Sequence, residues 1–192
     1  MPARLRERLD RWWRERHPAT DSLVLDHRNV YIVPSPAGWM LAATIAVLLV
    51  ASINYQLNLG YLLTFLLAGS AAAGMHMTHG NLRGLRLLLS PPDPQFAGTH
   101  ATLQIVLAND RQVTRHGIGL AVRDAPADVR WVWADVPGQG SAQVQVAFQP
   151  GRRGLHPVPA LTAETRYPLG AFRVWAWWRP ASRVLVYPSP EA

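Results

Sequence analysis

Few residues in this chain have the types and spacing that a reactive or metal-binding site requires. His76 and His79 are three positions apart, so on a helix they would share one face, as a pair of metal ligands can. No carboxylate or third histidine lies near them in the sequence. The chain has no cysteine, which excludes disulfides, thiol chemistry and cysteine-ligated zinc. We find no phosphate-binding glycine loop and no nucleophile motif. We therefore predict no metal site, no cofactor and no enzymatic activity; a metalloenzyme that uses His76 and His79 is the alternative.

Tryptophans and arginines form the second functional signal. Trp131/Trp133 and Trp175/Trp177 are i,i+2 pairs, so each pair would lie on one face of a strand. Such pairs commonly belong to a core or a strand surface. The functional alternative is a docking surface, because Trp and Arg are enriched at binding hot spots. The candidate partner surface consists of Arg152, Arg153, Arg173, Trp175 and Trp177.

An uncharged stretch determines which elements would position these residues. Between Arg28 and Arg83 there is no Asp, Glu, Lys or Arg, and one helix across a bilayer needs only about 20 apolar residues. The polar residues of the stretch gather in its middle, at residues 54–58. We therefore predict a transmembrane hairpin over residues 37–78, with helices at about 37–53 and 59–78, embedded in the lipid bilayer.

The second predicted helix carries small residues at regular spacing. Gly69/Ala73 and Ser70/Gly74 are four apart, which allows close approach of two membrane helices. We favour packing on the first helix of the same hairpin; self-association into a homo-oligomer is the alternative.

The distribution of arginine predicts the topology. All basic residues are arginine, and the net charge is +7. Arginines flank the hairpin on both outer sides and are absent from its turn, so the positive-inside rule places both termini in the cytoplasm. The basic residues cluster in the arm beside the membrane, and the others are spread over the domain after the hairpin. This distribution fits a membrane flank better than a nucleic-acid footprint, so we predict no nucleic-acid partner.

The segments on either side of the hairpin differ in kind. Residues 1–36 form a basic arm, predicted to be partly helical because Leu5, Leu9, Trp12 and Trp13 follow a helical period. Residues 30–33 are read as a short extended approach to the membrane. Residues 82–188 alternate with a period of two between turn residues, which predicts an antiparallel β-sandwich of the immunoglobulin or fibronectin type. The predicted strands lie at about residues 82–89, 101–108, 117–123, 130–134, 142–148, 154–158, 161–165, 172–178 and 184–187.

Five segments resemble a known family. They are RNVYIVPSPAG (28–38), INYQLNLGYLLTF (53–65), HGNLRGL (79–85), RRGLH (152–156) and TRYPLGAFRVW (165–175). Together they are similar to bacterial membrane proteins of the domain-of-unknown-function-58 family. The resemblance spans nearly the whole chain, but family members continue past the position of Pro190 into a region like a von Willebrand A domain. It therefore implies an N-terminal part or a short form.

The resemblance also implies a function. Family members accompany MoxR-type AAA+ ATPases and von Willebrand A-domain proteins, so the expected partners are a protein of one of these kinds and the lipid bilayer. We expect a non-enzymatic scaffold of the bacterial inner membrane, with its β-sandwich in the cytoplasm. The alternative is an envelope-facing binding module for a cell-wall or secreted ligand.

Overall fold

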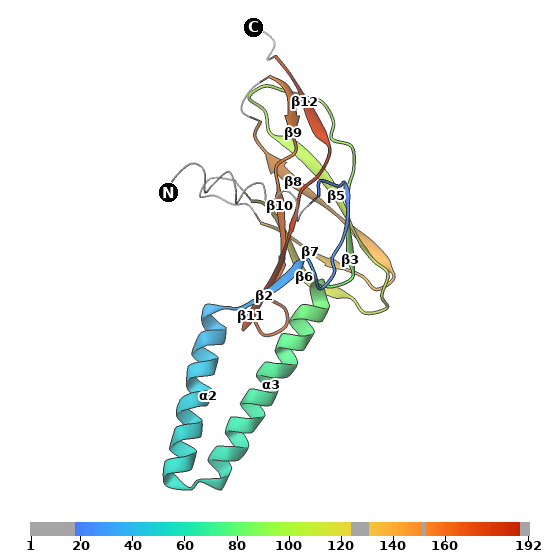
Figure 1. The fold of residues 1–192 in the computed structure, drawn as a ribbon. Coiled ribbons are helices and arrows are strands. Elements are labelled where there is room, and N and C mark those ends of the chain that lie inside the picture. The colour runs from blue at the N-terminus through green and yellow to red at the C-terminus, as the bar shows by residue number, and fades with distance from the viewer. Residues whose placement is uncertain (1–17, 124–130, 151–152, 189–192) are drawn as a thin grey trace.

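The computed structural model describes residues 18–123, 131–150 and 153–188. The described chain has two apolar helices and is otherwise mostly β-sheet (Figure 1). The helices extend side by side from one end of the β-domain, and β9 and β12 lie at its opposite end (Figure 1). The coarse prediction of two apolar helices followed by an antiparallel β-fold is confirmed.

The two helices begin and end close to where the sequence predicts them. α2 spans Pro36–Tyr55 and α3 spans Asn58–Leu82. Ser35 caps α2 by accepting a hydrogen bond from the Gly38 amide at 3.1 Å, and Pro36 suits the first helical position because its missing N–H would have no helical partner there. α3 runs beyond the predicted end at residue 78. It stops before Gly84, which has a φ of +85° that favours glycine.

Both helices are long and apolar enough to cross a membrane, and only 11% of the most apolar window of each is buried by the rest of the protein. Large apolar side chains therefore lie open along them, among them Met40 (72% exposed) and Leu59 (79% exposed).

The strands form three sheets among the described residues. Two larger sheets have the orders β1-β3-β5-β8 and β2-β11-β10-β6-β7, and a small sheet has the order β4-β12-β9. All pairings are antiparallel except β4 with β12. The strands are β1 (Ser22–Val24), β2 (Val30–Pro34), β3 (Leu85–Leu89), β4 (Gln95–Phe96), β5 (Ala101–Asn109), β6 (Arg115–Val122), β7 (Val132–Val136), β8 (Gly140–Phe148), β9 (Gly154–Pro157), β10 (Leu161–Thr165), β11 (Phe172–Trp178) and β12 (Arg183–Tyr187).

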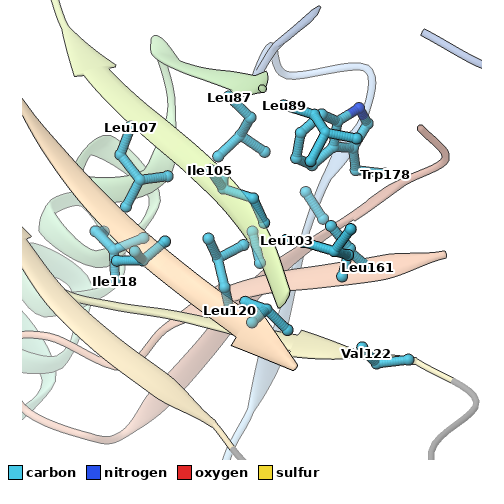
Figure 2. Packing of buried hydrophobic residues seen from close by; sticks show 14 of the residues in the cluster. Leu87, Leu89, Leu103, Ile105, Leu107, Ile118, Leu120, Val122, Leu161 and Trp178 are labelled. Carbon is cyan, nitrogen blue, oxygen red and sulfur yellow. The ribbon is translucent and has the colours of Figure 1, made fainter. Parts of the chain in front are cut away.

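One hydrophobic core lies between the two larger sheets. Alternate residues of β5, among them Leu103 and Ile105, face Leu120 of β6 and Trp178 of β11 in a single cluster (Figure 2). On β8, Val144 and Val146 are buried, and Phe148 packs against the cluster. Burial of this apolar surface is the main stabilising term for the β-domain.

The N-terminal segment departs most from the sequence-based prediction. Residues 22–24 and 30–34, expected to lie in an arm outside the sandwich, are strands of the two larger sheets: β1 pairs with β3, and β2 pairs with β11. Leu25 between them is fully buried. These strands are short, and their partners are far away in sequence, so no local pattern indicated the pairing. The predicted helix among residues 1–17 lies outside the described residues.

Candidate functional site

The outer face of the five-stranded sheet carries most of the tryptophans of the β-domain. On β11 the inner residues Val174, Ala176 and Trp178 are buried in the core, so the period of two places Trp175 and Trp177 on the outer side. We call this outer surface the aromatic face. Its members are Tyr31, Trp131, Trp133, Trp175 and Trp177.

Three rings of the aromatic face are in contact on β2 and β11. Tyr31 is the register partner of Trp175, and their ring centroids are 4.9 Å apart in a stacked arrangement. Trp175 and Trp177 are 4.4 Å apart. The guanidinium carbon of Arg123 lies 4.1 Å from the ring centre of Trp177, a cation–π contact. These rings form one continuous aromatic and cationic strip.

The second pair of tryptophans lies across the sheet, on the β7 side. The rings of Trp131 and Trp133 stack with centroids 5.7 Å apart. Trp133 is 50% exposed and its ring lies against Gly119 of β6, where an added Cβ would come within 2.7 Å of the ring. Gly119 therefore leaves the space that the ring occupies. The sequence did not single out this glycine, although its position opposite Trp133 in the register explains it.

Glu164 lies between the two tryptophan pairs, and sequence analysis missed its role. It is the register partner of Trp175 on one side and of Gly119 on the other. Its side chain is 1% exposed, and it forms ion pairs with Arg173 at 2.5 Å and with Arg166 at 3.2 Å. A buried carboxylate requires such partners, so Glu164 fixes Arg173 beside the aromatic rings. The only sequence signal was an acidic residue within a strand.

The structure brings together three of the five residues of the candidate partner surface. Arg173, Trp175 and Trp177 share the outer side of β11. Arg153 precedes β9 in the small sheet, at the end of the β-domain remote from the helices (Figure 1). Arg152 lies outside the described residues. Arg153 therefore does not extend the aromatic face.

A groove of about 580 Å³ borders the aromatic face. Tyr31 and Trp177 line one side, and Arg28 and Asn29 of the turn before β2 line another. The groove combines apolar rings with two cations (Arg28 and Arg179), a carboxylate (Asp26) and an amide, which are side chains suited to binding a peptide segment.

The sheet that carries the aromatic face also holds the helices. The Ser35 amide and hydroxyl donate hydrogen bonds to the carbonyls of Ala171 and Gly170 at 2.9 and 2.6 Å. A Cβ on Gly38 would lie 2.0 Å from the Ala171 oxygen, so only glycine permits this approach of α2. These contacts join the start of α2 to the loop before β11.

The end of α3 is joined to the same sheet. Asn81 is 5% exposed, and its side-chain amide donates to the His116 carbonyl at 2.7 Å and to the Thr165 hydroxyl at 2.8 Å. Its side-chain oxygen accepts from the His116 amide at 3.1 Å. A buried side-chain amide that lacks hydrogen-bond partners destabilises the folded state. This network therefore holds α3 against β6 and β10.

The small residues of α3 do not form the expected contact with α2. A Cβ on Gly69 would have no atom within 4 Å outside its own surroundings, and Ser70 and Ala73 are exposed. Gly74 is buried, but its neighbour is Leu169 of the loop before β11. Close approach of the helices occurs instead near the hairpin turn, where a Cβ on Gly60 would lie 2.3 Å from the Ser52 hydroxyl.

Within the described residues no group of three or more His, Asp or Glu is arranged to hold a metal ion. His76 is exposed on α3, and neither it nor His79 has a carboxylate partner among the described residues. The chain matches no family model, and no curated protein sequence matches it significantly.

Proposed function

We propose that the protein is a non-enzymatic scaffold of the bacterial inner membrane that presents its aromatic face to a cytoplasmic protein partner. In this proposal α2 and α3 span the bilayer, and the β-domain is an immunoglobulin- or fibronectin-like sandwich. The observation that carries the proposal is the composition of the outer face of the five-stranded sheet. Tyr31 and Trp133 are 37% and 50% exposed, and a solvated sheet face has no physical need for large aromatic side chains.

The attachment of the helices supports a scaffold. β2 leads directly into α2. Ser35 joins the start of α2 to the loop before β11, and Asn81 joins the end of α3 to β6 and β10. A surface fixed in this way to a membrane anchor keeps its orientation relative to the bilayer. Such preorganisation lowers the entropy cost of binding.

The proposed partner is a MoxR-type AAA+ ATPase or a von Willebrand A-domain protein. This part of the proposal rests on the resemblance of the chain to the domain-of-unknown-function-58 family. Aromatic rings next to Arg173 are the side chains that most often supply the binding energy at protein–protein hot spots, which agrees with a protein ligand.

Single cysteines test the topology, because the chain has none of its own. Asn58→Cys lies at the hairpin turn, and Ser141→Cys lies at an exposed position of β8. Intact cells are treated with a membrane-impermeant maleimide, and lysed cells serve as the labelling control. We expect labelling of the first variant in intact cells and of the second only after lysis. Labelling of Ser141→Cys in intact cells would contradict the proposal and favour an envelope-facing binding module.

Affinity capture tests the partner. The full chain is recovered from detergent-solubilised membranes, and co-purified proteins are identified by mass spectrometry. We expect an AAA+ ATPase or a von Willebrand A-domain protein to co-purify with the native chain. Less of this protein should be recovered with the Trp175→Ala variant. Repeated recovery of neither class would count against the proposed function.

A further inference from the structure

A second pocket lies where α3 meets the β-domain, away from the aromatic face. Its volume is about 340 Å³. Met77 and Gly80 of α3 line one side, and Arg111, Arg115 and His116, from the β5–β6 connection and β6, line the other. The proposed scaffold function makes no use of this pocket.

The arginines of the pocket are not neutralised. Arg115 is 6% exposed; its terminal nitrogens donate to the carbonyls of Gly80 and Arg83 at the end of α3, and its buried Nε has no partner. Among the described residues no carboxylate forms an ion pair with Arg83, Arg111 or Arg115. Burial and the neighbouring charge of Arg111 lower the pKa of Arg115, as expected where positive charges lie close together without a counter-ion.

Two acidic side chains, Asp110 and Asp135, lie close to residues of the pocket, and each has partners other than the pocket arginines. Asp110 pairs with Arg86 at 2.8 Å. Asp135 accepts a hydrogen bond from the Gly117 amide at 2.7 Å and lies 3.2 Å from Nδ1 of His116. These two contacts lower the pKa of Asp135, which keeps it ionised beside His116. Arg111 therefore remains the exposed cation of the pocket.

The position of the pocket along α3, measured from the hairpin turn, indicates which anion would reach it. A helix rises 1.5 Å per residue, so about 30 Å of hydrocarbon corresponds to about 20 residues. Counted from Asn58 at the hairpin turn, the hydrocarbon ends near Thr78. Met77 and Gly80 then lie at the boundary between the hydrocarbon and the lipid headgroups. This step rests on the membrane-spanning hairpin of the proposed function.

We propose that the pocket binds the phosphate of an anionic phospholipid. Arg111 and Arg115 supply the positive charge, as basic pockets beside transmembrane helices do for lipid headgroups. Met77 and Val113 are 56% and 70% exposed and border the pocket, where they would contact the start of the acyl chains. The same chemistry would accept a free phosphate ion, so the experiment separates the two sources.

Thermal unfolding of the full chain in a neutral detergent tests the proposal. Short-chain phosphatidylglycerol, phosphatidylcholine and inorganic phosphate are titrated separately, and the shift in Tm is recorded. We compare Arg111→Gln with Arg183→Gln, which removes the same charge from an exposed position of β12. Arg115 is left intact because it caps α3. We expect phosphatidylglycerol to cause a saturable shift in the Tm of the native chain. Arg111→Gln should need about fivefold more lipid for the same shift, because it loses one cation near a lipid surface. Arg183→Gln should respond as the native chain does.

Three outcomes would overturn the proposal. Equal shifts with phosphatidylglycerol and phosphatidylcholine would show that the phosphate charge is not recognised selectively. Equal weakening in both variants would assign the effect to net charge. A saturable shift with inorganic phosphate at the same concentrations would assign the pocket to a soluble anion. The assay does not depend on topology or on a protein partner, so a failed labelling or capture experiment leaves this result interpretable.

Discussion

The outer faces of the two larger sheets follow the same strand alternation but carry different side chains. On the four-stranded sheet the outer residues are polar or aliphatic. Gln104 and Gln143 are joined by a hydrogen bond of 3.0 Å, Arg86 pairs with Asp110, and Val24, Leu88 and Val106 are the larger aliphatic members. On the five-stranded sheet the outer residues include the rings of the aromatic face, and the carboxylate between the two tryptophan pairs, Glu164, is buried. The polar side chains of the first face are those that a solvent-exposed sheet face usually carries. The second has a composition that hydration does not explain, which is why we assign the docking function to it.

The largest expected difference between the two faces concerns partner binding. Trp175→Ala should reduce recovery of the partner about 30-fold, because truncating an aromatic hot spot costs about 2 kcal/mol of binding free energy. Gln145→Ala, at an exposed outer position of β8, is the matched control and should leave recovery unchanged. Quantitative mass spectrometry of the captured ATPase measures both. Equal recovery from the two variants would remove the functional distinction between the faces.

The second difference is in stability. Glu164→Gln should lower the free energy of unfolding by about 2 kcal/mol, because Arg173 and Arg166 lose their counter-charge next to a buried site. Both arginines reach water, with side chains 37% and 55% exposed, so the effect is smaller than for a fully buried pair. Gln104→Ala on the polar face should change stability by less than about 0.5 kcal/mol. Denaturant-induced unfolding in detergent, followed by a signal from the β-domain, measures both free-energy changes. Similar changes in the two variants would refute the structural role of Glu164.

The third test concerns the space under Trp133. Gly119→Ala should cost about 1–2 kcal/mol, because the new methyl group would meet the ring within 2.7–2.9 Å. The cost should disappear when the same substitution is made in a Trp133→Ala background, since the ring is then absent. Ser141→Ala, on the polar face, serves as a control with little effect. A cost that persists without the ring would place the strain elsewhere in β6.

The smallest expected effect is at the edge of the four-stranded sheet. Asp21 precedes β1 and accepts hydrogen bonds from the Ser182 amide and hydroxyl and the Ala181 amide at 2.8–2.9 Å. Burial alone would raise the pKa of Asp21, but these hydrogen bonds outweigh it and hold the pKa below its ordinary value. The stabilisation is thus present above the unfolded pKa of about 3.9 and is lost as the pH falls through the folded value.

Asp21→Asn should therefore cost about 1 kcal/mol at pH 7 and should make stability less dependent on pH below about 4. Unfolding of both proteins at pH 7 and pH 3 measures the difference. Asp93→Asn, an exposed acid in the proline-rich turn, is the control. A parallel loss of stability in the native chain and in Asp21→Asn would mean that another carboxylate dominates the acid response.

Much of the fold was predictable because its signals are local. The uncharged run and the polar turn located the helices, and the period of two located most strands to within a few residues. The alternation of β11 also predicted that Trp175 and Trp177 share a face. Alternation did not reveal that this face is the outer one, because both faces of the strand carry large apolar residues.

The candidate site was predictable only in part. Arg173, Trp175 and Trp177 were identified by composition and spacing, but Arg153 was grouped with them although it precedes β9, a strand of a different sheet. Glu164 and Gly119 were missed, because each has its role only through a register partner on a neighbouring strand. The type of a residue indicates which chemistry it can perform. Which residue it contacts depends on chain segments that are far away in the sequence.

The sequence by itself determined the apolar hairpin, the β-rich domain and the absence of cysteine chemistry, since each depends on residue type and local period. The tertiary structure decided that β1 and β2 join opposite sheets, that Glu164 is buried between two arginines, and that Arg111 and Arg115 meet at the end of α3. Tertiary contacts of this kind can join residues that lie more than a hundred positions apart in the sequence, such as Ser35 and Gly170. Their energies come from packing and charge pairing across strands, which no local pattern records.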